Sequence, residues 1–188
     1  MFEVEIRSKC ANLNKLKNKI ISIGAVHIKT EVLIDKVFGR PKDLDNNTKI
    51  IEGRFSARIR KNEKKTLVEF KQIKRNGIGL EFSSPVPEIS DGEEFLTSLG
   101  YEEAFTVSKV RDTFQITDFE LCLDRVDILG DYLEIEHTSD KKNKSILLKE
   151  CKEMLSSIDP KMKIESKKYG DLMQDLINST TKNIKTNN

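Results

Sequence analysis

The sequence of 188 residues has little net charge and no long apolar run. Its 33 lysine and arginine residues are nearly matched by 31 acids, so the net charge is only +2. A general nucleic-acid binder carries a clear cationic excess, so we expect no nucleic-acid partner. No run approaches the roughly 18 apolar residues of a membrane span, and the N-terminus shows no signal-peptide pattern. We therefore expect a cytoplasmic protein with no membrane partner.

Cysteine is also scarce. The three cysteines, Cys10, Cys122 and Cys151, are far apart in the sequence and form no CxxC pair. An odd number of widely spaced cysteines argues against a disulfide framework. We expect reduced thiols, as in an intracellular protein.

The residues that are present predict one α+β domain over residues 1–177, because the apolar fraction of 37% is enough for a core. Apolar residues at helical spacing predict helices over 12–24, 91–100, 141–158 and 167–177. Strand-forming residues and turn signals predict eight strands, over 2–9, 25–39, 54–61, 66–73, 78–88, 104–117, 119–129 and 131–138. The polar segment 178–188 predicts a disordered tail.

Charged residues alternate with apolar ones along nearly every predicted strand. In Phe2–Lys9, for example, Glu3, Glu5 and Arg7 share one parity and the apolar residues the other. Because successive side chains of a strand point to opposite faces, each strand presents charge on one face. An ordinary sheet with one face in water explains any single strand of this kind. The charges are nevertheless segregated into double-acid and double-base strands, which a water-facing sheet does not require.

The alternative is a closed antiparallel barrel of eight strands that is apolar outside, under flanking helices, and charged inside. Such a barrel encloses a lumen wide enough for side chains or one small ligand. The lumen candidates are the acids Glu3, Glu5, Glu81, Asp124, Glu134 and Glu136 and the bases Arg7, Arg58, Arg60, Lys71, Lys109 and Arg111. Arginine forks suit phosphate oxygens, and clustered carboxylates suit a hard cation such as Mg²⁺ or Mn²⁺. Together they predict a metal–polyphosphate site.

Six segments in this order resemble the CYTH superfamily, which includes class IV adenylyl cyclases, thiamine triphosphatases and tripolyphosphatases. "EVEIR" is similar to the family's ExExK signature, "ARIR" to its RxR strand, "VEFK" to its single-lysine strand and "VSKVR" to its KxR strand. "LDRVDILGDYLEIE" and "KKYGDLM" are similar to two further family segments, so that the resemblance covers roughly residues 1–176. It implies a closed barrel called the triphosphate tunnel.

The resemblance also implies residue roles. Glu3, Glu5, Glu134 and Glu136 stand where the family has metal-binding acids, with Asp124 near them. The triphosphate-binding bases correspond to Arg7, Arg58, Arg60, Lys71, Lys109 and Arg111, and Glu81 falls where many members have an acid that faces the tunnel. The sequence departs from the family pattern at three positions: Arg7 replaces the signature lysine, Gly79 a frequent arginine and Ser83 a common second acid.

Three functions are compatible with this reading. The closest pattern is that of a class IV adenylate cyclase, a lyase that converts ATP to cyclic AMP and pyrophosphate. The second is a triphosphatase, a hydrolase acting on tripolyphosphate, thiamine triphosphate or a nucleoside triphosphate. The third is a protein that binds polyphosphate or a nucleotide without turnover. The first two require Mg²⁺ or Mn²⁺, and the resemblance allows a homodimer.

Overall fold

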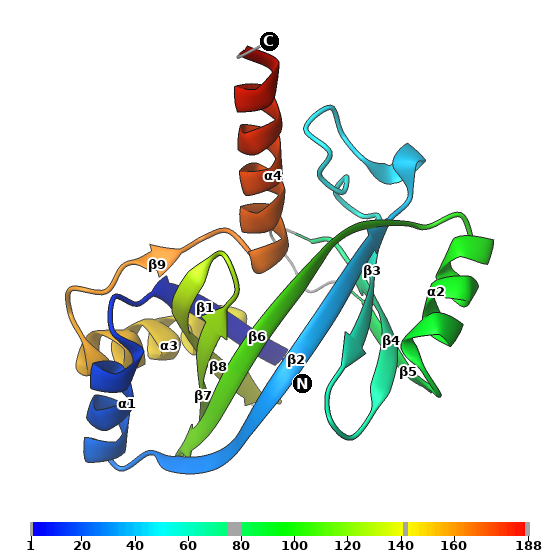
Figure 1. Ribbon diagram of the computed structural model, residues 1–188. Coiled ribbons are helices and arrows are strands. Elements are labelled where there is room, and N and C mark those ends of the chain that lie inside the picture. Colours follow the sequence, from blue (N-terminus) through cyan, green and yellow to red (C-terminus); the bar gives the residue numbers. More distant parts are fainter. Residues whose placement is uncertain (1, 75–79, 141–142, 187–188) are drawn as a thin grey trace. The chain divides into compact units, whose positions relative to one another are not determined.

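The computed structural model of the chain describes residues 2–74, 80–140 and 143–186, and its described residues form nine strands, four α-helices and one short 3₁₀ helix (Figure 1). The elements are β1 (Phe2–Lys9), α1 (Leu13–Ser22), β2 (Val26–Gly39), η1 (Pro41–Asp43), β3 (Phe55–Lys61), β4 (Thr66–Gln72), β5 (Glu81–Val86), α2 (Ile89–Ser98), β6 (Glu102–Ile116), β7 (Phe119–Val126), β8 (Gly130–Ser139), α3 (Lys144–Ile158), β9 (Ile164–Glu165) and α4 (Tyr169–Thr186). The predicted α+β class is confirmed.

The strands form one antiparallel sheet in the order β5-β4-β3-β2-β6-β7-β8-β1-β9. The sequence predicted eight strands, and the additional one is β9, whose two residues pair with Arg7 and Ser8 of β1. So short a strand has no alternation that a sequence pattern could reveal. Closure of the sheet into a barrel stays a prediction.

The chain divides into two compact units. The first unit contains Met1–Val32 and Lys109–Ser166, and the second contains Leu33–Ser108 and Lys167–Asn188. The long strands β2 and β6 each contribute one part to each unit. That residues 1–177 act as a single domain stays a prediction.

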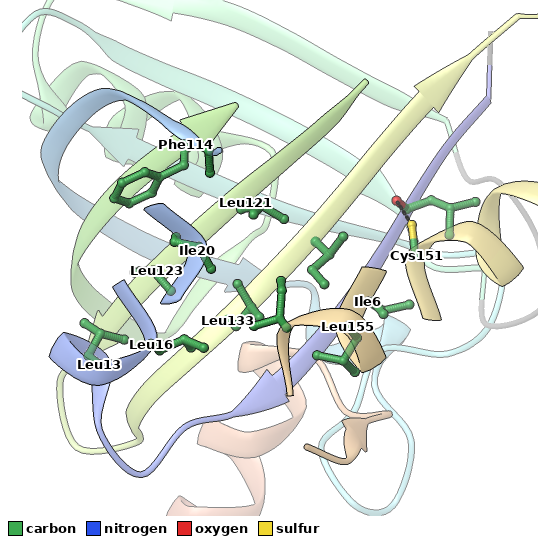
Figure 2. Packing of buried hydrophobic residues seen from close by; sticks show 14 of the residues in the cluster. Ile6, Leu13, Leu16, Ile20, Phe114, Leu121, Leu123, Leu133, Cys151 and Leu155 are labelled. Carbon is green, nitrogen blue, oxygen red and sulfur yellow. Dashed lines mark hydrogen bonds between the residues drawn. The ribbon is translucent and has the colours of Figure 1, made fainter. Parts of the chain in front are cut away.

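The first unit has an apolar sheet face that is covered by α1 and α3. Figure 2 shows Leu13, Leu16 and Ile20 of α1 and Cys151 and Leu155 of α3 directed at the sheet. The buried cluster comprises Val4, Ile6, Leu13, Leu16, Ile20, Ala25, Phe114, Leu121, Leu123, Leu133, Ile135, Leu147, Cys151, Leu155 and Ile158. The strand members of this cluster are the apolar half of the alternation, so the charged half lies on the opposite face.

Local signals fix the position of α1. The Asn12 side chain accepts a hydrogen bond from the backbone N–H of Lys15 at 2.9 Å, which caps the first turn. After the helix, Gly24 has a φ of +98°, a left-handed conformation that glycine adopts without steric cost. The predicted helix and its glycine stop are therefore confirmed.

The second unit has its own core. Helix α2 covers one face of β3 and β4, where Phe38, Ala57, Ile59, Val68, Leu96 and Tyr101 are buried together. Gly92 permits the close approach of α2, because a Cβ at that position would lie 3.1 Å from side-chain carbons of Ile59 and Val68. Arg58 and Arg60 alternate with the buried residues of β3 and therefore point to its other face.

Two further observations concern the ends and the thiols of the chain. Helix α4 runs to Thr186, so most of the segment 178–188, for which the sequence predicted disorder, is helical instead. A polar composition is compatible with a helix as well as with a coil, so composition alone could not predict the structure of this segment. Cys10, Cys122 and Cys151 are free thiols, as predicted. Among the described residues, no helix is long and apolar enough to cross a membrane.

Candidate active site

The charged face of the first unit is built by the register of four neighbouring strands. Arg7 of β1 lies opposite Glu134 of β8, and one step along the strands Glu5 lies opposite Glu136. Asp124 of β7 lies opposite Arg111 of β6. Residues directly opposite in an antiparallel pair point to the same face. The alternation seen in single strands thus becomes one continuous charged surface.

Arg111 is the centre of this face. Its Nε and Nη2 donate to the two carboxylate oxygens of Asp124, each at 2.6 Å, and Nη2 also donates to Glu134. Lys109 Nζ donates to the same Asp124 carboxylate at 2.8 Å. Asp124 is completely buried. A buried carboxylate of this kind is stable only because two cations contact it.

Glu134 links Arg111 to Arg7. The Nε atom of Arg7 donates to Glu134 at 2.6 Å, and the Nη2 atom of Arg7 contacts both Glu134 and Glu5. Burial alone would raise the pKa of Glu134, but the charges of Arg111, Arg7 and Lys109 outweigh it, and the pKa lies well below its ordinary value. Glu134 is therefore ionised and holds both guanidinium groups in place.

The pKa values of the two bases on β6 move in opposite directions. Burial, together with the neighbouring positive charge of Arg111, lowers the pKa of Lys109. Burial opposes the charge of Arg111 too, but the hydrogen bonds and charges of Asp124 and Glu134 raise its pKa overall. Arg111 is thus a permanent cation in a buried setting, which is what binding of a multiply charged anion requires.

A row of acids crosses the same face beside these bases. Glu136 of β8 lies opposite Glu5 of β1 and opposite Glu120 of β7, and we call these three residues the acidic row. Like charges directly opposite one another destabilise a sheet. Burial, followed by the charge of Glu5, raises the pKa of Glu136 to about 8 from its ordinary 4.5, although Arg111 acts in the other direction.

The acidic row fits a hard divalent cation. One ligand atom from each of Glu120, Cys122 and Glu136 lies within 4.8 Å of the others. Carboxylate oxygens from neighbouring strands are the donors that Mg²⁺ and Mn²⁺ prefer, and a cation there would remove the repulsion that disfavours ionised Glu136. Glu134, Asp124 and Glu5 already accept hydrogen bonds from bases. The metal-binding character of this face is therefore strongest at Glu136 and Glu120, the two acids of this group.

This electrostatic arrangement predicts an unusual pH dependence of stability. Between pH 4.5 and about 8, Glu136 is protonated in the folded protein and ionised in the unfolded chain. The unfolded state then binds fewer protons, so the free energy of unfolding should fall as pH rises, by up to about 1.4 kcal/mol per pH unit from this group. Urea denaturation in EDTA measures the slope.

The control for the pH experiment is Glu136→Gln, which should flatten the curve across the same window. The lowered pKa of Glu134 affects stability in a different pH range. The stabilising contribution of Glu134 is present above pH 4.5 and is lost only as pH falls below that value. Parallel curves for the two proteins between pH 5 and 8 would show that Glu136 is not in the repulsive setting described.

The second unit also carries a charged face, on β2, β3, β4 and β5. Arg60 donates from Nε and Nη2 to Asp35 at 2.7 and 2.6 Å. Arg58 donates from Nε to Glu69 at 2.7 Å and from Nη1 to Asp35 at 3.4 Å. Lys71 and Glu81, which lie opposite each other on β4 and β5, form an ion pair.

The structure thus groups the predicted site residues within each unit. The first unit gathers seven of them on one face: Glu5, Arg7, Lys109, Arg111, Asp124, Glu134 and Glu136. The second unit gathers Arg58, Arg60, Lys71 and Glu81. Glu3 pairs with Thr138 in the β1–β8 ladder, but its side chain is outside the described part of the chain, as is Gly79.

Three acids of these faces were missed at the sequence level. Asp35, Glu69 and Glu120 had no place among the predicted site residues, although each lies beside one of them. Parity gives the signal for two of them: Glu69 is two residues before Lys71, and Glu120 is four residues before Asp124, so each shares a face with its neighbour. Asp35 lies between Ile34 and Lys36 and has no charged residue two positions away on its own face, so it offers no doublet.

Comparison with known proteins identifies the class. The family model described as "CYTH domain" matches residues 1–168. Because this match spans most of the chain, the protein belongs to the CYTH domain family, which confirms the resemblance seen in the six segments. Members of this family act on triphosphates with a divalent metal.

The relatives are similar over nearly their whole length. A protein of Methanocaldococcus jannaschii named "Putative adenylate cyclase MJ0240" is 29% identical over 164 residues, covering 85% of this chain and 90% of its own. The PH1012 protein of Pyrococcus horikoshii has a solved structure with a TM-score of 0.73 and 23% identity, covering 89% of this chain and 97% of its own.

A third similar structure is that of a protein from Hippeastrum. The structure described as "Putative adenylyl cyclase HpAC1 from Hippeastrum", for which a dominant triphosphatase activity is stated, has a TM-score of 0.67 at 13% identity and covers 92% of this chain and 94% of its own. At such identities the two solved structures establish the fold alone.

Proposed function

We propose that this protein is a divalent-metal-dependent enzyme that acts on a triphosphate, and that it is an adenylate cyclase, which converts ATP to cyclic AMP and pyrophosphate. One observation carries the proposal: the charged face of the first unit places three bases, two of them buried, beside a row of acids that repel one another. The bases suit phosphate oxygens and the acids suit a cation, so the face matches both parts of a metal–triphosphate complex. The name of the M. jannaschii relative supports the cyclase.

The bases of the first unit would bind the phosphate groups without rearrangement. Arg7 and Arg111 are fixed by Glu134, and Lys109 is fixed by Asp124. Groups that are already oriented toward the developing charge of a transition state lose no free energy in reorganising when the reaction occurs. They also align the triphosphate so that the attacking oxygen and the leaving group are in line.

The acids would hold the metal. Glu136 and Glu120 are the main candidates by their geometry, and Glu3, Glu5, Asp124 and Glu134 are assigned to the metal by the resemblance to the family motifs. A bound Mg²⁺ or Mn²⁺ supplies a Lewis acid that polarises phosphoryl oxygens and favours ionisation of an attacking hydroxyl. The protein's own contribution is to hold these carboxylates close to one another and next to the bases that would bind the phosphates, so that a bound cation would favour the ionised form of Glu136.

The residues of the second unit enter the proposal through the sequence resemblance. Arg58 and Arg60 stand in the RxR-like strand and Lys71 in the single-lysine strand, so we propose that they too bind the triphosphate. The closed eight-stranded tunnel, its charged lumen and the role of Glu81 are proposals on the same ground.

A triphosphatase is the second candidate. The dominant triphosphatase activity stated for the Hippeastrum protein favours it, since that protein shares this fold. The same bases and acids would position water rather than the ribose 3′-hydroxyl, and the attack would fall on a terminal phosphorus rather than on the α-phosphorus of ATP. The two reactions use the phosphate and metal residues alike.

Identification of the products tests the proposal. The pure protein is incubated with ATP, and separately with inorganic tripolyphosphate, in the presence of Mg²⁺ or Mn²⁺. We expect cyclic AMP and pyrophosphate in equal amounts from ATP. Orthophosphate from either substrate would instead support the triphosphatase and contradict the cyclase. Tight triphosphate binding with no product under either metal would contradict both and favour a non-catalytic binding protein.

A further inference from the structure

Asp35 is a buried acid on the charged face of the second unit, and only 6% of its surface is exposed. It lies on β2, opposite Arg60 of β3. The β2–β3 register places Val37 opposite Arg58 on the same face, so Asp35 is the acid that β2 presents to both arginines. A buried carboxylate without cationic partners is strongly disfavoured, and Asp35 has two such partners.

The contacts of Asp35 fix the orientation of Arg60. Both oxygens of the carboxylate accept hydrogen bonds from the Nε–Nη2 edge of the guanidinium, at 2.7 and 2.6 Å. A bidentate contact of this kind sets the plane and the direction of the whole group, whereas a single contact leaves it free to rotate. The long side chain of Arg60 is therefore ordered before any ligand arrives.

Asp35 also reaches Arg58. The Nη1 atom of Arg58 lies 3.4 Å from Asp35, while its Nε atom donates to Glu69 of β4 at 2.7 Å. Arg58 is thus held at two corners of its guanidinium, by acids on the strands at either side of β3. Arg58 and Arg60 are two residues apart on one strand and repel each other, and Asp35 is the acid that contacts both.

The location of the hydrogen bonds between Asp35 and the two arginines indicates that Asp35 positions the arginines and does not serve the core alone. The core of the second unit contains Ala57 and Ile59 of β3, both fully buried, and the two arginines point to the opposite face. The side chain of Arg58 is 35% exposed and that of Arg60 is 23% exposed, so both remain accessible to a ligand. A network placed only to stabilise the core would not need to present two aligned cations to the exterior.

We propose that Asp35 is a positioning residue for triphosphate binding: its carboxylate holds the guanidinium groups of Arg60 and Arg58 in the orientation in which they bind phosphate oxygens. The inference rests on the proposed function, because it assumes that Arg58 and Arg60 bind the triphosphate. It adds that the orientation of the arginines, and not only their charge, determines the affinity.

The substitution Asp35→Asn tests the proposed positioning role, because charge and orientation predict opposite changes in the affinity for tripolyphosphate. Removing a negative charge beside two arginines makes the face more positive, so charge alone predicts tighter binding of an anion. Loss of orientation predicts weaker binding. We expect the dissociation constant of inorganic tripolyphosphate, measured by calorimetry on the full chain in EDTA, to rise about tenfold, as for other residues that orient binding groups.

Asp43→Asn is the matched control. Asp43 is an equally buried aspartate of the second unit, 6% exposed, and pairs with Arg54 at 3.5 Å, outside the proposed site. Its substitution should leave tripolyphosphate affinity unchanged, and an equal loss in both variants would overturn the inference. Unchanged or tighter binding by Asp35→Asn would also overturn it.

Arg60→Lys provides a test that does not depend on the folding of the Asp35 variant. Lysine keeps the charge but not the planar fork, so we expect a loss of affinity similar to that of Asp35→Asn. The double variant should lose little more than either single variant, because both remove the same oriented contact. Wild-type affinity in Arg60→Lys would contradict the inference. Failure of the wild-type protein itself to bind tripolyphosphate would instead contradict the proposed function.

Discussion

Replacement of Arg111 by alanine should abolish triphosphate turnover and also lower the free energy of unfolding by about 3–5 kcal/mol, the usual cost of removing one partner from a buried ion pair. Arg111 supplies two of the hydrogen bonds to the fully buried Asp124 and contacts Glu134 as well. Without it, Lys109 and Arg7 are left to compensate two buried carboxylates. Turnover should fall by at least about 100-fold, because the proposed function makes Arg111 a positioned donor to the triphosphate.

Arg125→Ala is the control for this experiment. Arg125 lies on β7 of the same unit, its side chain is 60% exposed, and it pairs with Asp131 at 3.7 Å. An exposed pair of this kind contributes little, so stability and turnover should stay close to those of the wild-type protein. The measurements are urea denaturation and the product assay. If Arg111→Ala were as stable and as active as Arg125→Ala, the charged face would have no central role.

Glu136→Gln, unlike Arg111→Ala, should lower turnover without lowering the free energy of unfolding. Turnover should fall by about 100-fold or more. Loss of a group that only orients a metal ligand lowers activity by up to about 100-fold, and Glu136 is proposed to be a ligand itself. Stability in EDTA at pH 9 should not fall, because the substitution removes the repulsion from Glu5 and Glu120 across the acidic row. A residue whose removal harms activity while relieving strain is typical of a functional site.

Glu153→Gln is the matched control for Glu136→Gln. Glu153 lies on α3 of the same unit, and its side chain is 64% exposed. Its substitution should change neither turnover nor stability measurably. Full activity of Glu136→Gln would contradict the assignment of the acidic row to the metal. A marked loss of stability in EDTA would contradict the repulsive setting of Glu136.

Alternation was the part of the fold that the sequence revealed best. In β1, β3 and β8 the period of two separates charged from apolar side chains so clearly that the face of each site residue follows from its parity. Helix α1 was equally predictable from the sequence, because Leu13, Leu16 and Ile20 recur at helical spacing before Gly24. These patterns are local, which is why a single sequence contains them.

Features that depend on register were not visible in the sequence. Parity states that Glu5 and Glu136 face the same way, but only the β1–β8 register makes them direct neighbours and joins Glu120 to them. Asp35 is a similar case: it belongs to no charged doublet of its own strand, and its importance comes from Arg60 on the neighbouring strand. Long-range pairing supplies this information, and no short pattern encodes it.

Helix α4 illustrates a different limit. The segment from Asn178 onward is polar and predicted a disordered tail, yet the helix continues to Thr186. In the part of this segment whose side chains are described, Asn178 donates to the backbone carbonyl of Asn47 at 3.2 Å. Such a contact with a distant loop favours the helix, and composition alone gives no indication of it.

The most direct test of the central claim compares binding of a triphosphate with and without its metal. Calorimetry with a non-hydrolysable imido analogue of tripolyphosphate, added either as its Mn²⁺ complex or in EDTA, measures both affinities. The charged face and the acidic row together predict that the wild-type protein binds the Mn²⁺ complex at least about tenfold more tightly than the metal-free anion. Glu136→Gln should lose this preference while still binding the metal-free anion. Equal affinity for both forms in the wild-type protein would contradict the claim that this face binds a metal and a triphosphate together.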